Sequence, residues 1–295
     1  MKTEFLTNSQ WADYELIDSG NGEKLERFGK YTLIRPEPQA LWDKSMSDAE
    51  WNNMAQATFK REGRGEDMGE WLCKREMPDQ WQISYNYKEM KLRMRLGLTA
   101  FKHVGVFPEQ CSNWNFIYDS VKALGGDSNV KVLNLFAYTG CASLAARSAG
   151  AEVTHVDSIK QVVNWSKENM ELSGLKDIRW IVEDALKFVK REVKRGKKYN
   201  GIMLDPPAYG RGTDGERWIL EKNINEMLKE CAKLLTPNGF VVFSLYSMGL
   251  SAMLAKTLAN QAFGAAPQEQ LGELYFADKA GKSLPMGVYY RFLRK

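Results

Sequence analysis

Apolar runs and amphipathic stretches alternate along the C-terminal two thirds of the chain. The run Val130–Phe136 predicts a buried parallel strand, and the alanine-rich stretch after Gly140 predicts a helix. Further strands are expected at 153–157, 178–182, 201–204 and 240–246, with helices at 159–173, 185–195, 218–235 and 250–261. Two final strands, 270–277 and 288–293, have no helix between them, which indicates an antiparallel hairpin. The pattern predicts a doubly wound α/β sheet of five parallel strands with an antiparallel edge.

The first hundred residues have a different pattern. Short strands are expected at 14–18, 24–28, 31–35, 81–87 and 88–96, and a helix capped by Ser47 at 48–58. We expect a small, mostly β domain over residues 1–97 and a second domain over 98–295. Lys91, Arg93 and Arg95 alternate with apolar residues and should share one strand face. That face is either solvated or a wall that contacts phosphates.

The composition says more about the cellular location of the protein than about any reaction it catalyses. The start of the chain lacks the charged and apolar regions of a secretory signal, and no apolar run approaches the ~20 residues that span a bilayer. The four cysteines form no CxxC pair and have no histidine at metal-ligand spacing, so neither disulfides nor a metal site is expected. These features predict a cytoplasmic protein. A net charge of +4 does not by itself indicate nucleic acid.

Residues that follow the predicted strands should carry the chemistry, because ligands bind at the carboxyl ends of parallel strands. The turn 137–140 lacks the G-x-G-x-x-G pattern, which favours a ligand without a diphosphate over a dinucleotide. Asp157 follows the second strand near the ~20-residue offset of a carboxylate that binds ribose hydroxyls, although such residues also cap helices. Asp184 follows the third strand and either accepts a hydrogen bond from adenine or caps the next helix.

The most specific motif follows the fourth strand and consists of Asp205, Pro206 and Pro207, with Tyr209 close behind. Paired prolines fix the backbone and remove two N–H donors, so carbonyl acceptors remain beside the Asp205 carboxylate. A rigid rim of acceptors suits an amine or the edge of a base. Residues 211–215 are expected to form a mobile loop that acts as a lid or substrate clamp.

Together, the segments NLFAYTG, HVD, EDA and DPPAYG resemble the class I S-adenosylmethionine-dependent methyltransferases. That resemblance implies a Rossmann-like, seven-stranded sheet with an antiparallel terminal hairpin. Within the class, the chain is most similar to bacterial 23S ribosomal RNA methyltransferases of the I/K/L type, in which a stretch like KTGFFLDQ precedes the catalytic domain. Here Gly105, Phe107 and Gln110 match that stretch, Glu109 replaces its Asp, and His103 and Val104 replace its Lys and Thr.

The resemblance also implies the cofactor, S-adenosylmethionine, and roles for particular residues. Tyr138, Thr139 and Gly140 would lie along its methionine part, Asp157 at the ribose and Asp184 at the adenine, while Phe107 and Gln110 would close the pocket. The candidate cofactor-binding residues are His103, Phe107, Gln110, Phe136, Tyr138, Thr139, Gly140, Asp157, Ser158, Asp184, Ala185 and Asp205. The candidate catalytic residues at the methyl acceptor are Asp205, Pro206, Pro207 and Tyr209.

The absence of a cysteine from two of the strand ends bears on which atom accepts the methyl group. Methylation at carbon 5 of a pyrimidine needs a cysteine nucleophile, and neither 205–208 nor 243–247 contains one. We therefore expect transfer to a base nitrogen of RNA, with ribosomal RNA preferred and transfer RNA, a protein, a small molecule or a non-catalytic RNA-binding role as alternatives. A basic run on the third helix is either a solvated face or a phosphate-binding one. Its members are Lys187, Lys190, Arg191, Lys194, Arg195, Lys197 and Lys198.

Overall fold

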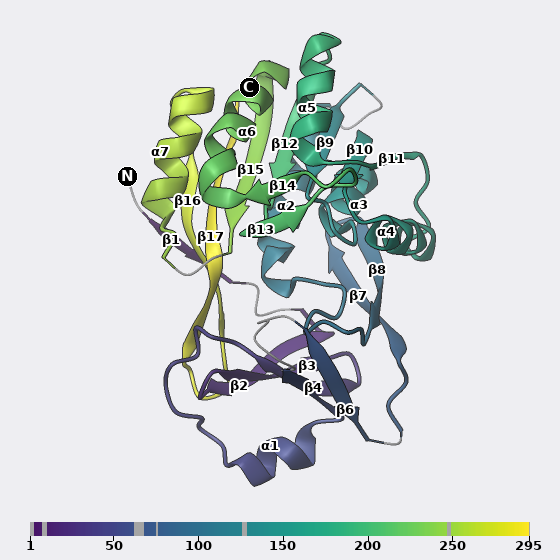
Figure 1. Cartoon of the computed structure of the whole chain (residues 1–295), viewed down its shortest axis with the longest axis vertical. Coiled ribbons are helices and arrows are strands. Elements are labelled where there is room, and N and C mark those ends of the chain that lie inside the picture. Colours follow the sequence, from purple (N-terminus) through teal and green to yellow (C-terminus); the bar gives the residue numbers. More distant parts are fainter. Residues whose placement is uncertain are drawn as a thin grey trace.

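A smaller N-terminal lobe lies beneath a larger α/β lobe in the computed structural model (Figure 1). The structure describes residues 3–7, 11–61, 68–74, 76–125, 129–246 and 249–294. None of the helices within these ranges is long and apolar enough to cross a bilayer.

The larger lobe contains an eight-stranded sheet in the order β1-β16-β17-β15-β12-β9-β10-β11. Strands β9 (Lys131–Leu135), β10 (Glu152–Asp157), β11 (Ile178–Val182), β12 (Tyr199–Leu204) and β15 (Leu235–Leu245) are parallel. Strands β16 (Gln270–Ala277) and β17 (Ser283–Leu293) form the antiparallel hairpin. The predicted α/β sheet is confirmed. Strand β1 (Glu4–Leu6), which pairs with β16 as an eighth strand, was not predicted.

Helices cover both faces of this sheet. One face carries α2 (Cys111–Ala123), α3 (Cys141–Ser148) and α4 (Lys160–Leu172), whose apolar side chains join one core. The other face carries α5 (Ala185–Lys194), α6 (Leu220–Leu234) and α7 (Ala252–Phe263), which pack in a second core. The fold prediction did not include α2.

The expected start of a helix at 218 is wrong. Residues Arg217–Ile219 form β14, which pairs antiparallel with β13 (Tyr209–Arg211), so α6 begins at Leu220. Residues 211–215, expected to be a mobile loop, therefore belong to a short hairpin: Arg211 ends β13, and residues 212–215 lie in the turn. Ser158 holds this hairpin through a 3.1 Å hydrogen bond to the Arg211 carbonyl, and Lys187 is ion-paired with Asp214.

The N-terminal lobe is mostly β, as predicted. Strands β2 (Tyr14–Gly20), β3 (Glu23–Phe28), β4 (Tyr31–Pro36), β5 (Ala57–Arg61) and β6 (Gly69–Cys73) form one sheet. Helix α1 (Asp48–Met54) begins at the predicted cap, where Ser47 and Glu50 form a capping box.

A separate hairpin of β7 (Gln80–Tyr87) and β8 (Met90–Gly97) joins the lobes by packing against α3 and α4. The predicted alternation on β8 is present: Lys91 and Arg93 are exposed, whereas the Arg95 guanidinium stacks 4.1 Å from the Trp165 ring and pairs with Glu168. Arg95 thus attaches β8 to α4.

Candidate active site

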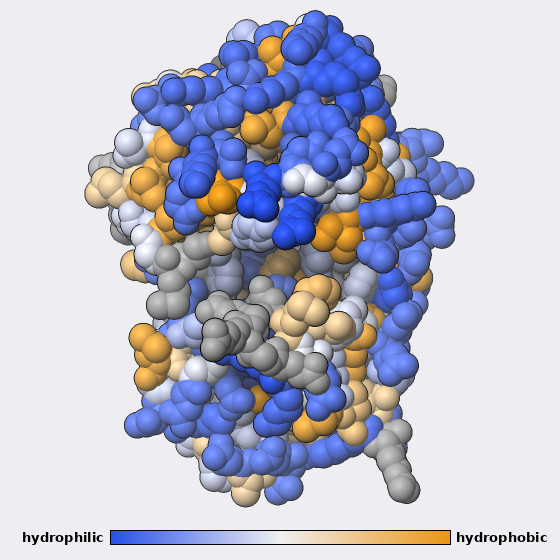
Figure 2. Space-filling view, viewed as in Figure 1, coloured by the Kyte–Doolittle hydropathy of each residue, from blue (hydrophilic) through white to orange (hydrophobic). Residues whose placement is uncertain are grey.

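The parallel strands end where the lobes meet. Loops after β9, β10, β11 and β12 therefore lie near the N-terminal lobe, and Figure 2 shows the surface hollowed between the lobes. The predicted candidate residues belong to these loops and to the segment 101–110, which connects β8 to α2.

The loop after β9 has an unusual backbone. Phe136, Tyr138 and Gly140 have φ angles of 55°, 48° and 91°, in the left-handed region that aromatic side chains rarely adopt. Glycine is favoured at 140, because a side chain there would be strained at this φ and its Cβ would lie only 3.1 Å from the Ser166 Cβ. Ser166 and Asn169 of α4 donate hydrogen bonds of 2.7 and 3.0 Å to the carbonyls of residues 138 and 139. The packing of α4 thus holds a strained loop at the strand end.

Asp157 is joined to the same loop. Its Oδ2 accepts a 2.9 Å hydrogen bond from the Tyr138 amide, and its Oδ1 accepts one of 2.9 Å from the Ile159 amide. Burial raises the pKa of this carboxyl, and the backbone amides partly oppose that effect. A carboxylate fixed by backbone amides keeps further lone pairs for hydroxyl donors.

The segment 101–110 packs against the loop after β9. The Phe107 ring lies 5.1 Å from the Tyr138 ring and 5.2 Å from the His103 ring. The Thr139 hydroxyl donates a 2.7 Å hydrogen bond to the Gly105 carbonyl, so this buried side chain joins the two segments. Phe107, His103 and Tyr138 therefore form an aromatic wall.

Gln110 lies at the N-terminus of α2, where it connects to the end of β15. Its Oε1 accepts hydrogen bonds from Asn113 Nδ2 (2.9 Å) and from the Ser244 hydroxyl (3.2 Å). Arg291 in turn donates a 3.0 Å hydrogen bond to Asn113 Oδ1. This network fixes the Gln110 amide beside the strand ends.

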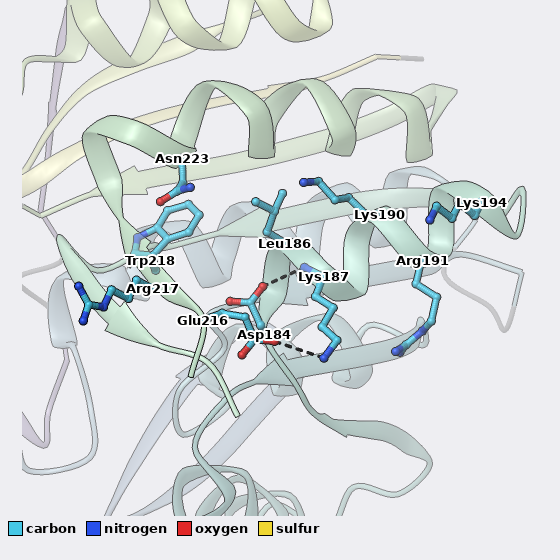
Figure 3. A pocket seen from close by; sticks show the side chains of 10 residues that line it. All are labelled: Asp184, Leu186, Lys187, Lys190, Arg191, Lys194, Glu216, Arg217, Trp218 and Asn223. Atoms are coloured by element: carbon cyan, nitrogen blue, oxygen red, sulfur yellow. Dashed lines mark hydrogen bonds and ion pairs between the residues drawn. The ribbon is translucent and has the colours of Figure 1, made fainter. Parts of the chain in front are cut away.

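Asp184 caps α5, which is one of the two roles that its position allowed. Its Oδ1 accepts a 2.8 Å hydrogen bond from the Lys187 amide. Ala185, the next residue, is buried in the core under α5. A cavity of about 470 Å³ is lined by Asp184, by residues of α5 and by Trp218. Figure 3 shows Asp184 among these side chains, between Trp218 and Lys187.

Asp205 lies at the tip of β12. Burial raises the pKa of its carboxyl to about 6. Pro206 is buried and Pro207 is exposed, but the Pro207 carbonyl already accepts a 2.7 Å hydrogen bond from Trp218 Nε1. Part of the expected acceptor rim is therefore engaged within the protein. Tyr209 begins β13 and is 53% exposed.

Trp218 is a site residue that the sequence analysis missed. Besides its bond to Pro207, its ring lies 4.7 Å from the Phe136 ring, so it links the loops after β9 and β12. The alternation of polar and apolar residues over Arg217–Ile219 could have indicated a strand here, but the amphipathic pattern of the following helix continues through it. Trp81, Tyr85 and Trp114 are buried in the core, so none of these three rings is available to stack on a base.

Comparison with known proteins adds independent evidence. Residues 23–268 match the family model described as S-adenosylmethionine-dependent methyltransferase. A crystal structure of the SAM-dependent methyltransferase from Agrobacterium tumefaciens shares 40% identity and a TM-score of 0.91, covering 100% of this chain and 95% of that one. The fold also matches SMU.776 complexed with S-adenosylhomocysteine, with a TM-score of 0.73 at 19% identity over 96% of this chain and 76% of that one.

A curated relative gives a more specific name. The Shewanella frigidimarina protein named ribosomal RNA large subunit methyltransferase K/L is 34% identical over 170 residues, which are 56% of this chain. The match covers only 23% of that relative's length. The family model and the Agrobacterium structure both cover most of the chain. The chain belongs to the S-adenosylmethionine-dependent methyltransferase family.

Proposed function

We propose that this methyltransferase transfers the methyl group of S-adenosylmethionine to a nitrogen of an RNA base, preferably in ribosomal RNA. The main observation in its support is the tip of β12, where partly buried Asp205 is followed by buried Pro206 and, four residues after Asp205, by exposed Tyr209. The name of the Shewanella relative supports RNA as the substrate class.

The residues at the strand ends fit the cofactor by their chemistry. Asp157 offers a fixed carboxylate to ribose hydroxyls, and Phe107 with Tyr138 offers an aromatic wall. Asp184, Ala185 and Ser158 would border the adenine, and Thr139, Gly140 and Gln110 the methionine part. The bound cofactor supplies a sulfonium that is already activated, so the protein needs no strong nucleophile of its own.

The task of the chain's own residues is to orient the acceptor and take its proton. A base nitrogen held near 3 Å from the methyl group gains about 7–11 kcal/mol from positioning alone. With its pKa near 6, the Asp205 carboxyl is mostly ionised at pH 7 and accepts a hydrogen bond from the acceptor N–H. As the nitrogen forms its bond to the methyl carbon, the C–S bond breaks and the N–H proton passes to Asp205, then to water. Tyr209 can stack on the base.

A nitrogen acceptor is also favoured by the state of the cysteines. Cys141 is the cysteine next to the loop after β9, and burial raises the pKa of its thiol to about 12. Such a thiol is not a nucleophile at neutral pH. Cys111 and Cys231 are buried as well, and Cys73 lies on β6 of the N-terminal lobe.

The basic face of α5 contributes less to the proposal than its charge suggests. Lys187, Lys190 and Arg191 are ion-paired with acidic residues, and Figure 3 shows Lys187 turned toward Glu216. To bind phosphate, these basic side chains would have to leave their acidic partners. The N-terminal lobe, which borders the cleft, is the proposed RNA-binding part.

Mass spectrometry of nucleosides tests the proposal. Ribosomal RNA from cells that lack the gene should miss one base-methylated nucleoside, which returns with the wild-type gene but not with an Asp205→Ala variant. Loss from transfer RNA alone would favour that alternative, and no loss from any RNA would favour a protein or small-molecule acceptor. Loss of 5-methylcytosine would refute the nitrogen assignment.

A further inference from the structure

The β13–β14 hairpin lies across the ends of three parallel strands. Ser158, after β10, donates a 3.1 Å hydrogen bond to the carbonyl at the end of β13, and Trp218 of β14 donates one of 2.7 Å to Pro207, after β12. After β11, Asp184 lies so close to the hairpin turn that a Cβ on Gly212 would be 3.0 Å from the Asp184 Cβ. These contacts fix the hairpin over the edge of the sheet where the candidate active site lies.

One face of this hairpin is basic and exposed to solvent. Side chains alternate between the two faces of a strand, and Arg211 of β13 lies directly opposite Arg217 of β14. Tyr209 shares their face, and its hydroxyl accepts a 3.2 Å hydrogen bond from Arg211 Nε. These three residues are exposed, whereas Trp218, on the other face, is buried. The hairpin thus presents a tyrosine and two arginines outward.

The two arginines lie side by side without an acidic partner. Among the residues that the structure describes, no carboxylate is ion-paired with either guanidinium. The acidic residues of the same turn, Asp214 and Glu216, pair with Lys187 instead. In Figure 3 the Arg217 guanidinium points away from Glu216. Like charges at directly opposite positions of an antiparallel pair repel each other and weaken the pairing, so an anion bound between them would stabilise the hairpin.

The cofactor is not the anion that this face would bind. S-adenosylmethionine contains no phosphate, and its sulfonium gives it a net positive charge, so unpaired guanidinium groups repel it. Arg217 also lines the cavity beside α5 together with Lys194, which within the described ranges has no ion-pair partner either. The unpaired cations therefore extend from the hairpin toward α5. This arrangement suits a chain of negative charges, and RNA carries one at each phosphodiester group.

We propose that Arg211 and Arg217 together bind one backbone phosphate of the RNA substrate, next to the nucleotide that receives the methyl group. This inference rests on the proposed function and deepens it, because it assigns residues that hold the RNA backbone. The Cβ atoms of directly opposite residues are about 4.5–5.5 Å apart, so both guanidinium groups can reach the same phosphate and donate paired hydrogen bonds to it. Tyr209 is two residues from Arg211 and four from Asp205, so a base next to that phosphate can stack on its ring beside the tip of β12.

The test uses the full chain, tritiated S-adenosylmethionine and ribosomal RNA from cells that lack the gene. The double variant Arg211→Gln/Arg217→Gln should raise KM for RNA about tenfold, while kcat stays within about threefold and the calorimetric Kd for S-adenosylmethionine is unchanged. The slope of log Kd for RNA against the logarithm of the salt concentration should fall by about 0.7–1, the contribution of one phosphate contact. Arg211→Lys/Arg217→Lys keeps both charges, so it should keep the wild-type slope, but its KM should rise because the paired hydrogen bonds are lost.

Lys176→Gln/Lys197→Gln is the matched control, because it removes the same charge from two exposed residues at the opposite edge of the sheet, just before β11 and β12. It should keep the wild-type KM and salt slope. The inference is overturned if the glutamine variant of the arginines keeps the wild-type KM or slope, if it loses cofactor affinity, or if the control changes KM and slope equally. If the glutamine variant does not fold, the lysine variant decides, and a wild-type KM there would overturn the inference. Wild-type protein that binds the cofactor but methylates no RNA would refute the proposed function itself, and this inference with it.

Discussion

Replacing Lys282 by methionine should destabilise the whole chain, because this residue clamps the terminal hairpin to the N-terminal lobe. The β16–β17 hairpin extends down to that lobe in Figure 1. At its tip, Lys282 Nζ donates hydrogen bonds to Asp18 Oδ1 (2.8 Å) and to the carbonyls of Ser19 (2.6 Å) and Asp43 (3.1 Å). The Asp18 side chain is 1% exposed.

The magnitude follows from the state of Asp18. Burial opposes its charge, but hydrogen bonds from Lys282, the Met46 amide and Trp51 outweigh that effect and lower its pKa from 3.8 to about 2. This difference corresponds to about 2.5 kcal/mol of stability, present above pH 4 and lost as the pH falls toward 2. Removing the cation from a mostly buried pair should cost about 2–4 kcal/mol, or roughly 5–15 °C in Tm.

Urea unfolding at pH 7 and at pH 3, followed by tryptophan fluorescence, measures both effects. Lys279→Met is the control on the same turn, since Lys279 is 58% exposed and pairs with Glu15 at 3.3 Å. Its loss should change the free energy of unfolding by less than 1 kcal/mol. If Lys282→Met costs no more than the control, or if Asp18→Asn and Lys282→Met prove additive in the double mutant, the clamp does not act as described.

Three changes in the site separate cofactor binding from transfer. Asp157→Ala should weaken S-adenosylmethionine about 10–100-fold in calorimetry, because hydrogen bonds to its ribose are lost; unchanged affinity would contradict this role. Asp205→Asn should keep the affinity for S-adenosylmethionine but lower kcat about 10²-fold. It should also remove the rise of the wild-type rate with pH near pH 6; if the rise remains, a group other than Asp205 causes it. Trp218→Phe keeps an aromatic ring against Phe136 but removes the N–H that donates to the Pro207 carbonyl. It should therefore lower the free energy of unfolding by about 1 kcal/mol and lower kcat. If the variant has the Tm and kcat of the wild type, this hydrogen bond is dispensable.

The sheet could be predicted because each of its parallel strands is a short apolar run with its own helix. Central strands such as β9 and β12 are buried on both faces, so their pattern does not depend on distant residues. Strand β1 could not be found in this way, since three residues carry almost no periodicity and their pairing with β16 joins opposite ends of the chain. The helix start at 218 failed because Trp218 fits an amphipathic helix as well as it fits β14.

The candidate site could be predicted where one rule applies, namely that ligands bind at the carboxyl ends of parallel strands. Asp157 is the last residue of β10 and Asp205 directly follows β12, so the rule brings them to one edge of the sheet. The conformation of 136–140 could not be read in advance, because left-handed angles at Phe136 and Tyr138 contradict local preference and persist through the contacts of α4. Asp184 remains both a helix cap and a proposed adenine ligand, since one carboxylate oxygen suffices for the cap.

The N-terminal lobe matters for the chemistry because it changes the electrostatics at the strand ends. An open edge of the sheet would leave Asp205 and Glu109 in water, where carboxyl groups ionise near pH 4. Both groups are shielded from water in the folded chain, and the burial raises each pKa by a different amount. The lobe is fixed in place by β1, by β8 against α4 and by the Lys282 clamp. Because these attachments come from three separate parts of the chain, weakening any one of them should alter the pH dependence of transfer before it alters the sheet itself.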